Sequence, residues 1–471
     1  LGRVKIGVSP FHGEGRVANT LSLNIASVGL LTEAVGEKKP GKVIQYRLAP
    51  RILESVDPVV GKNITRTFWL TLRSDAGTRP GEFDAIITIT PEQGSKTEIP
   101  FHVTVLPLTL TDTDIQYGMM MDYAFYELDS TGWTDQERKT LARQGAAIYR
   151  DLREHGMTMV YPHSRFVYLQ DRSGAPVLES LREALVYYRK IGFPGPFCWY
   201  LGHLLHTAKP KHPGSILLYD EAVAERRLRD LLRYFERLAG EVGIAKERLV
   251  VQLVDEPDRE DRDRVEAAKK LNAVAHELGF RTLITRPWPE VSIMCTGTPD
   301  SDAEADRLRL MENEWWIYPN GALTGLNLCY TRYVFGFGAW QWGVKGVVPW
   351  TYQMGEGSNG NPFTVLDGPE IMVTYPWGGS VLSTPVWEAV REGITDYRYI
   401  FQLERLIAAA KRRGSSRVAA IEQRLAEMKR ARGSSPWSEQ GRFGNWPPES
   451  FDRKRSEIIK WACALNAELL R

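Results

Sequence analysis

The chain has 471 residues, 43% of them hydrophobic, so it is long enough for two or three domains and can bury a large core. A formal charge of +2, from 60 Lys and Arg against 58 Asp and Glu, argues against nucleic acid as the main partner, and the lack of any apolar stretch of about 18 residues argues against a membrane span. Four widely separated cysteines without a Cys-x-x-Cys pair exclude a dense disulfide framework and argue against cysteine-bound metal, so we expect neither a metal nor a cofactor.

The first 109 residues show the period-two alternation of β-strands. Four runs carry it, separated by turn clusters rich in Gly and Pro: 43–48, 66–73, 82–90 and 98–106. Short strands at this spacing predict a β-sandwich domain over residues 1–109. The segment holds few acid–base groups, so we expect it to have a packing or positioning role.

From residue 110 onward, short apolar runs alternate with long amphipathic ones, which is the βα pattern of a parallel sheet. The expected strands are 116–122, 157–161, 196–201, 249–255, 281–285, 291–295, 315–318 and 346–350. The expected helices are 135–155, 177–191, 221–242, 260–278, 301–311, 330–342 and 386–413, with a fifth-to-sixth link too short for a full helix.

Eight such units predict a TIM-type (β/α)8 catalytic barrel over residues 110–413. A doubly wound open sheet is the alternative, but no Gly-x-Gly-x-x-Gly follows an early strand. Two further helices, 416–432 and 452–470, are expected to pack on the barrel, so residues 414–471 form a C-terminal helical extension.

Chemistry-bearing residues gather where the predicted strands end. In a barrel, ligands bind at the carboxyl ends of the strands. Those ends carry Asp122, Tyr200 with His203, Asp255 with Glu256, Arg286 with Trp288, Tyr318, and Trp350 with Tyr352. Together they predict a polar, aromatic-lined pocket, and a surplus of 14 Trp and 19 Tyr suits the flat C–H faces of sugars. Large aromatic residues also fill ordinary cores, and His203, Asp122 and Arg286 have structural or ion-pairing alternatives.

Asp255 and Glu256 are the candidate catalytic pair. They follow the apolar run 249–254 directly, and charge at the tip of a buried strand is costly unless it has partners or a task. A structural salt bridge is the alternative. A two-carboxylate retaining barrel would carry a second Glu at the tip of the seventh strand, but Tyr318 stands there and Glu314 lies at the opposite end.

The missing nucleophile favours substrate assistance, in which the 2-acetamido oxygen of the sugar attacks its own anomeric carbon. Glu256 is then the general acid and later the base. Asp255 would stay ionised and bind the amide N–H, Tyr318 would hold the amide oxygen, and Trp350 would stack on the sugar ring.

Several motifs together resemble glycoside hydrolase family 123, whose known activity is that of a β-N-acetylgalactosaminidase. They are Phe68–Leu72 with Pro80–Phe83, Val254–Pro257, Trp315–Asn320, Asp367-Gly with Thr374–Trp377, and Trp387–Tyr399. The resemblance spans about residues 60 to 403 and implies a β-sandwich followed by a TIM barrel with a substrate-assisted Asp-Glu pair, here Asp255 and Glu256. Thr384-Pro-Val departs from the Ser-x-Arg-like start expected for the last barrel helix, a difference that concerns packing more than chemistry.

The sequence thus predicts an exo-acting β-N-acetylgalactosaminidase that acts on N-acetylhexosamine-containing glycans, with N-acetylgalactosamine preferred. A two-carboxylate glycosidase on a sugar without the 2-acetamido group and a non-catalytic carbohydrate-binding barrel are the alternatives. The chain starts at Leu1 with neither Met nor a signal-peptide pattern, which we interpret as a trimmed start compatible with a secreted or periplasmic protein. Compartment, oligomeric state, aglycone, and galacto against gluco configuration stay open.

Overall fold

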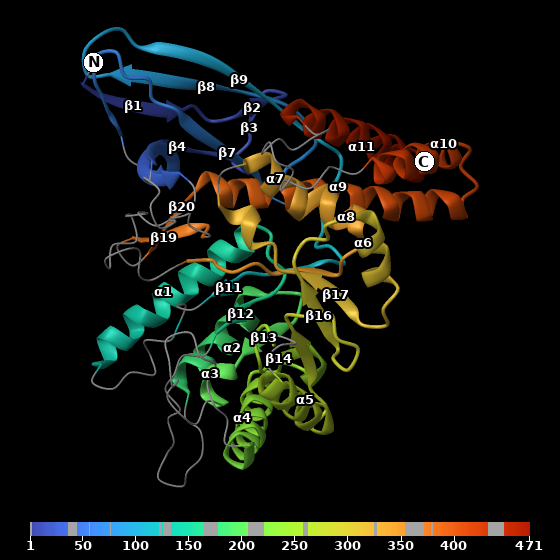
Figure 1. Ribbon diagram of the computed structural model, residues 1–471. Coiled ribbons are helices and arrows are strands. Elements are labelled where there is room, and N and C mark those ends of the chain that lie inside the picture. The colour runs from blue at the N-terminus through green and yellow to red at the C-terminus, as the bar shows by residue number, and fades with distance from the viewer. Residues whose placement is uncertain are drawn as a thin grey trace.

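The computed structural model combines antiparallel β-sheets from the N-terminal part, a parallel sheet flanked by helices, and C-terminal helices (Figure 1). It describes residues 2–35, 45–55, 57–75, 77–121, 125, 133–163, 178–205, 221–257, 262–324, 327–353, 372–377, 380–431 and 447–471. The mixed β and α/β content expected from the sequence is confirmed. In the part of the chain that the structure describes, no helix has both the length and the apolar composition needed to cross a bilayer.

Seven parallel strands form the central sheet. Their spatial order is β10 (Gln116–Tyr117), β18 (Gly346–Val347), β17 (Glu314–Ile317), β16 (Ile293–Thr296), β15 (Arg281–Ile284), β14 (Leu249–Gln252) and β13 (Phe197–Tyr200). A parallel pair, β11 (Met120–Met121) and β12 (Tyr161–Pro162), lies beside it. Isolated parallel bridges link this pair to β13 through His163 and Tyr200, and to the segment after β18 through Met120 and Trp350, so the parallel sheet curls.

Residues on the central strands alternate between two apolar clusters, because successive side chains point to opposite faces of a strand. Val250, Leu283 and Trp316 belong to a buried cluster inside the curl, together with Tyr161, Cys198 and Cys295. Val251, Ile284 and Ile317 belong to the cluster shared with the surrounding helices. Burial of both faces explains why these strands read in the sequence as continuous apolar runs.

The helices of this unit follow the strands in the predicted order. They are α1 (Asp135–Glu154), α2 (Glu179–Ile191), the short α3 (Gly202–Leu205), α4 (Glu221–Glu241), α5 (Arg262–Glu277), α6 (Asp302–Arg309), α7 (Leu328–Tyr333), the π-helical turn η4 (Val334–Gly338), α8 (Ala339–Trp342) and α9 (Pro385–Arg412). Residues 285–292, between β15 and β16, contain no helix. This agrees with the prediction that the link is too short for one.

Helix α9 starts at Thr384-Pro385 for a local reason. The Thr384 hydroxyl accepts the Trp387 N–H at 3.1 Å, which satisfies one of the donors that every helix start leaves open, and Pro385 occupies the first turn, where its missing N–H costs nothing. The same hydroxyl donates to the Val373 carbonyl at 2.7 Å. The departure from the family-like sequence at this position therefore leaves a capped helix.

The N-terminal part forms two antiparallel sheets. One contains β3 (Arg16–Val17), β2 (His12–Gly13), β8 (Gly81–Pro91), β1 (Gly2–Val8) and β6 (Val59–Val60), with β9 (Thr97–Val105) paired to β8. The other contains β19 (Thr374–Trp377), β20 (Ser380–Ser383), β5 (Gln45–Glu54), β4 (Leu21–Val35) and β7 (Phe68–Ser74). The two sheets share a small apolar cluster that includes Phe11, Leu21, Ala85 and Val103.

The hairpin β19–β20 was not predicted, and it changes how the two parts connect. It comes from the segment between β18 and α9, yet β20 pairs with β5 through Ser383 and Leu53. The chain therefore returns to the N-terminal sheets before α9 begins, and the two parts share a sheet.

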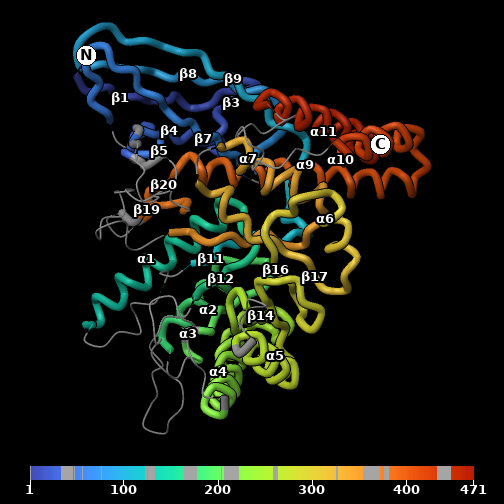
Figure 2. The backbone as a smooth tube through the Cα atoms, in the orientation of Figure 1, coloured from blue at the N-terminus to red at the C-terminus, as the bar shows by residue number. Residues whose placement is uncertain are grey.

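Two C-terminal helices, α10 (Val418–Arg430) and α11 (Pro448–Leu469), lie along α9 (Figure 2). Asp396 of α9 is fully buried and accepts from Arg332 of α7 at 2.7 Å and from Arg455 of α11 at 2.6 Å. A buried carboxylate needs such paired cations to offset its desolvation, so this contact fixes α11 onto the helices of the central unit.

Candidate active site

Asp255 and Glu256 lie three and four residues beyond the end of β14, in a turn rather than in the strand. Glu256 has a φ of +38°, in the left-handed region that costs a non-glycine residue about 1–2 kcal/mol. Such strain concentrates at functional sites and persists where the surroundings enforce it. Adjacent side chains on a regular strand point to opposite faces. Asp255 and Glu256 lie beyond the strand, so this constraint does not apply to them.

Thr285, the residue after β15, ties the two acids together. Its hydroxyl accepts the Glu256 main-chain N–H at 2.6 Å and donates to Asp255 Oδ1 at 3.0 Å. Both carboxylate side chains are exposed, so a ligand can reach them. One threonine on the neighbouring strand therefore fixes both the strained backbone of Glu256 and one oxygen of Asp255.

Asp255 has a second side-chain donor from its own strand. Gln252 is 1% exposed, and its Nε2 donates to Asp255 Oδ1 at 3.1 Å. The Arg264 guanidinium of α5 donates to the Asp255 main-chain carbonyl. Among the described residues, both side-chain donors reach Oδ1, and no described donor reaches Oδ2.

Tyr318 lies directly after β17, and its hydroxyl donates to Glu256 Oε1 at 3.0 Å. Burial raises the pKa of Tyr318 far above its usual value, and the nearby Glu256 carboxylate raises it further. Tyr318 therefore keeps its proton at neutral pH and donates it to Glu256. The predicted pair and the predicted tyrosine thus lie in direct contact, although they come from strands far apart in the sequence.

Trp350 is tied to the same edge through the main chain. Its N–H donates to Asn320 Oδ1 at 2.9 Å, and Asn320 lies two residues after Tyr318. Both Trp350 and Tyr318 are partly buried against the apolar cluster inside the curl, which they cover at its carboxyl end. The sequence did not predict this role of Asn320. Nothing in Trp315–Asn320 shows whether the asparagine side chain accepts a main-chain N–H or only occupies a turn.

A second aromatic pair lies on the opposite arc of the curl. Tyr200 ends β13, is 7% exposed, and packs against His163 with ring centroids 4.8 Å apart. His163 follows β12 and was not among the predicted contacts, although it ends the Tyr161-Pro-His tip. Its place beside Tyr200 makes it part of the same rim.

Tyr352 is the one predicted contact that the structure removes from the rim. It is 1% exposed, its hydroxyl donates to Asp151 Oδ2 at 2.7 Å, and its ring packs against Trp387. The strand stops at Val347, so the alternation that would have directed Tyr352 toward the pocket does not continue to it. Tyr352 is a packing residue between the central sheet and the helices α1 and α9.

The other predicted contacts are placed less fully. Arg286 follows β15 and is exposed, and Trp288 is partly buried against the cluster shared with the helices. His203 lies in α3, but its side chain is outside the described residues, as is the whole of Asp122.

Glu314 does not belong to this site. It is the first residue of β17, at the end opposite Tyr318, and it accepts from Arg281 at 2.7 Å. Residues 318–324, which follow β17, contain no carboxylate. The described part of the molecule thus has no acid at the tip where a second catalytic glutamate would be expected.

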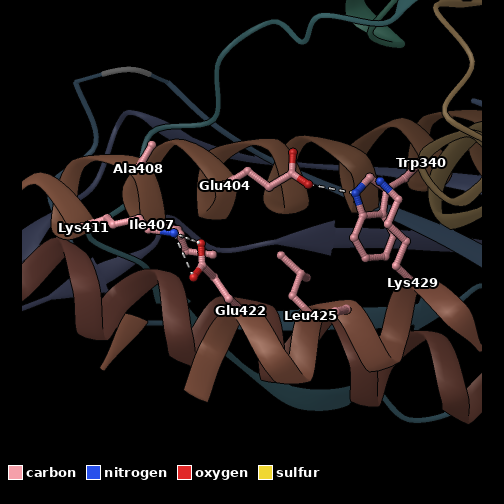
Figure 3. A pocket seen from close by; sticks show the side chains of 9 residues that line it. Trp340, Glu404, Ile407, Ala408, Lys411, Glu422, Leu425 and Lys429 are labelled. Carbon is pink, nitrogen blue, oxygen red and sulfur yellow. Dashed lines mark hydrogen bonds and ion pairs between the residues drawn. The ribbon is translucent and has the colours of Figure 1, made fainter. Parts of the chain in front are cut away.

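Among the described residues, no three or more His, Cys, Asp or Glu side chains are grouped so that they could hold a metal ion. A cavity of about 400 Å³ lies between α8, α9 and α10, remote in the chain from Asp255 (Figure 3). Its polar groups bond to one another, Trp340 Nε1 to Glu404 at 2.9 Å and Lys411 to Glu422 at 2.9 Å, so it presents no comparable constellation.

The fold is similar to that of a solved glycoside hydrolase. A family 123 enzyme from Clostridium perfringens, studied for glycolipid glycan hydrolysis, superposes with a TM-score of 0.68 and 14% identity over 99% of this chain and 89% of that one. A family 39 glycoside hydrolase from Bacteroides cellulosilyticus WH2 follows with a TM-score of 0.39, 10% identity, and coverage of 83% and 81%. No protein-family model matches the chain, and no curated protein matches its sequence. At this identity the first likeness shows a shared fold.

Proposed function

We propose that the protein is a glycoside hydrolase that removes terminal β-linked N-acetylhexosamine, with N-acetylgalactosamine preferred, by a retaining, substrate-assisted mechanism. The observation that carries the proposal is the contact of Tyr318 with the Asp255-Glu256 pair at a strand tip where a second catalytic acid would otherwise stand. The structural likeness to a family 123 glycoside hydrolase, and the motifs shared with that family, support it.

In the first step Glu256 protonates the glycosidic oxygen as the aglycone leaves. The acetamido carbonyl oxygen of the sugar attacks the anomeric carbon from the opposite face and closes an oxazolinium ring. Asp255 Oδ2 accepts the amide N–H and stabilises the positive charge that develops on it. Tyr318, which here donates to Glu256, would donate to the amide oxygen and orient it for attack.

In the second step a water molecule attacks the anomeric carbon and reopens the ring. Glu256, now a carboxylate, takes the proton of that water and returns to its acid form. The two inversions give net retention of configuration, and no protein side chain forms a covalent bond to the sugar.

The proposal also covers the closure of the sheet and the other residues at its rim. We infer that the curled sheet closes through the bridges at Tyr200 and Trp350 into an eight-stranded barrel, with a β-sandwich before it. Trp350 and Tyr200 would line the sugar ring. Asp122, His203, Arg286 and Trp288 remain candidates for contacts to its hydroxyl groups.

Turnover of nitrophenyl glycosides tests the proposal. The 2-acetamido-2-deoxy-β-galactoside should be hydrolysed, and the matching β-galactoside, which lacks the internal nucleophile, should not. Activity only on the β-galactoside would favour a two-carboxylate glycosidase. Binding of N-acetylgalactosamine without turnover of either substrate would favour a non-catalytic carbohydrate-binding barrel. The gluco epimer measures the preference at the axial O4.

A further inference from the structure

We propose that Gln252 and Tyr161 are positioning residues that orient Asp255 from inside the curled sheet. This inference rests on the proposed function, because it concerns how Asp255 meets the amide of the substrate. It assigns a role to two buried polar side chains that touch neither the solvent nor the sugar.

The two residues form a hydrogen-bonded chain that ends on Asp255. The Tyr161 hydroxyl, on β12, donates to Gln252 Oε1, on β14, and Gln252 Nε2 donates to Asp255 Oδ1 at 3.1 Å. Tyr161 is 0% exposed and Gln252 is 1% exposed. Cys198 of β13 is buried in the same cluster as Tyr161. The polar chain thus runs through an otherwise apolar interior.

The direction of this chain is fixed by the chemistry of its members. A carboxylate can only accept, so Gln252 must present its N–H groups to Asp255 and its carbonyl to Tyr161. Tyr161 must then donate its proton to that carbonyl. Burial raises the pKa of Tyr161 well above its usual value, so the hydroxyl keeps the proton it donates. Every hydrogen bond of the chain therefore points toward Asp255, and in a low-dielectric interior such bonds strengthen one another.

The chain also explains which Asp255 oxygen is available. Gln252 reaches Oδ1 from within the strand, and Thr285 reaches the same atom from the neighbouring strand. Two donors from different elements prevent rotation of the carboxylate, so Oδ2 is held in one position. A hydrogen bond to an amide N–H that becomes positively charged needs this fixed geometry, because small misplacements of a catalytic group lower rates by about 10- to 100-fold.

The molecule contains a matched control elsewhere. Tyr333 donates to Gln341 Oε1 at 2.7 Å, and Gln341 Nε2 donates to the Met428 carbonyl at 2.9 Å. Gln341 is 0% exposed. The two Tyr–Gln pairs are equally buried, but the second ends on a main-chain carbonyl among the helices and not on an acid. A substitution there should cost stability alone.

The experiment compares Gln252→Met, Gln252→Glu and Tyr161→Phe with Gln341→Met in the full chain. For each, kcat and KM are measured with the nitrophenyl 2-acetamido-2-deoxy-β-galactoside between about pH 3 and pH 9, and corrected for the folded fraction. We expect Gln252→Met to lower kcat about 10- to 100-fold with a smaller change in KM. Tyr161→Phe should act in the same direction with a smaller amplitude.

Gln252→Glu gives the sharpest readout. A protonated glutamic acid can still accept from Tyr161 and donate to Asp255, so activity should be retained in the acidic part of the profile. It should fall as the pH rises and the new carboxyl ionises against Asp255, which moves the alkaline limb to lower pH. Gln341→Met should leave kcat and both limbs unchanged.

A wild-type kcat in the folded Gln252→Met and Tyr161→Phe variants, or an unshifted alkaline limb in Gln252→Glu, would overturn the inference, as would an equal fall of kcat in Gln341→Met. If Gln252→Met does not fold, the Gln252→Glu and Tyr161→Phe profiles decide. If the unmodified protein turns over no 2-acetamido substrate, the proposed function fails, and that result is distinct from a failure of the positioning role.

Discussion

Two aspartates in this molecule are each held by side-chain donors, and they differ in how many of their carboxylate oxygens those donors reach. Asp151 on α1 has a side chain that is 16% exposed. Its Oδ2 accepts from Tyr352 at 2.7 Å and from Trp387 at 2.8 Å, and its Oδ1 lies 3.2 Å from His155 Nδ1. Asp255 is exposed, and its described side-chain donors both reach Oδ1.

The difference separates a structural carboxylate from the one that we propose to bind the substrate. Burial alone would raise the pKa of Asp151, but His155, Tyr352 and Trp387 together lower it below its usual value. With both oxygens engaged, Asp151 joins α1, α9 and the segment after β18. Arg391 and Glu388 extend this network toward Thr71 of β7. Asp255 keeps one oxygen without a described donor, which is what binding an amide N–H requires.

Glu256→Gln should give the largest loss of kcat. Glu256 is the neighbour of Asp255, so the network around Asp151 should be unaffected. Removing the proton donor should lower kcat for a substrate with a poor leaving group by about 10³-fold, with little change in the unfolding midpoint because the side chain is exposed. Steady-state kinetics on alkyl and nitrophenyl glycosides measure it. An equal loss on both leaving groups would contradict an acid role.

Asp151→Asn should give the reverse pattern. The asparagine carbonyl would still accept from Tyr352 and Trp387, but its N–H groups would face His155 Nδ1 and the negative charge would be lost, which should cost about 3 kcal/mol in the free energy of unfolding. Chemical denaturation measures this loss, and kcat per folded molecule should stay close to that of the unmodified protein. Asp114→Asn is the control, because Asp114 also accepts from a tyrosine, at 2.6 Å, but is 44% exposed.

The hydrogen bonds to Asp151 should also make the free energy of unfolding depend on pH. Because the pKa of Asp151 is lower in the folded chain than its ordinary 3.8, its contribution to stability is present above that pH and is lost as the pH falls through the folded value. The unfolding free energy of Asp151→Asn should therefore depend less steeply on pH below about 4 than that of the unmodified protein. Identical slopes would show that Asp151 is not charged in the folded state.

The smallest effects are expected from Tyr318→Phe and Tyr352→Phe. Each removes one tyrosine hydroxyl, the first from the Asp255-Glu256 pair and the second from Asp151. Loss of the Tyr318 hydroxyl should lower kcat about tenfold and leave stability nearly unchanged. Loss of the Tyr352 hydroxyl should cost about 1–2 kcal/mol of stability and leave kcat unchanged. An activity defect in Tyr352→Phe would return that residue to the sugar site.

The sequence was sufficient to predict the parallel strands and their helices, because strands buried on both faces read as unbroken apolar runs. The helical pattern of residues 221–242 likewise predicts α4 (Glu221–Glu241) closely. Strand β4 was missed because its alternation is interrupted by a bulge between Gly29 and Leu30. The hairpin β19–β20 was missed because its partner, Leu53, lies in the first part of the chain.

The site could be predicted as a set of residues but not as a geometry. Asp255, Glu256 and Tyr318 were identified from their places at strand ends, and they lie together. Tyr352 was misplaced, because the sequence does not reveal that β18 ends at Val347. The roles of Thr285 and Gln252 were missed, although a glutamine inside the apolar run Leu249–Val254 is the kind of buried polar residue that requires a partner.

Inhibition by a thiazoline analogue of the oxazolinium intermediate tests substrate assistance most directly. The account predicts competitive inhibition of the unmodified protein at concentrations at least about 100-fold below the KM of the nitrophenyl 2-acetamido-2-deoxy-β-galactoside, since intermediate mimics bind more tightly than substrates. It also predicts a large loss of this inhibition in Asp255→Asn, whose side chain no longer stabilises the cationic ring. Turnover of the substrate with no inhibition by the thiazoline, or equal inhibition of the variant, would contradict the account.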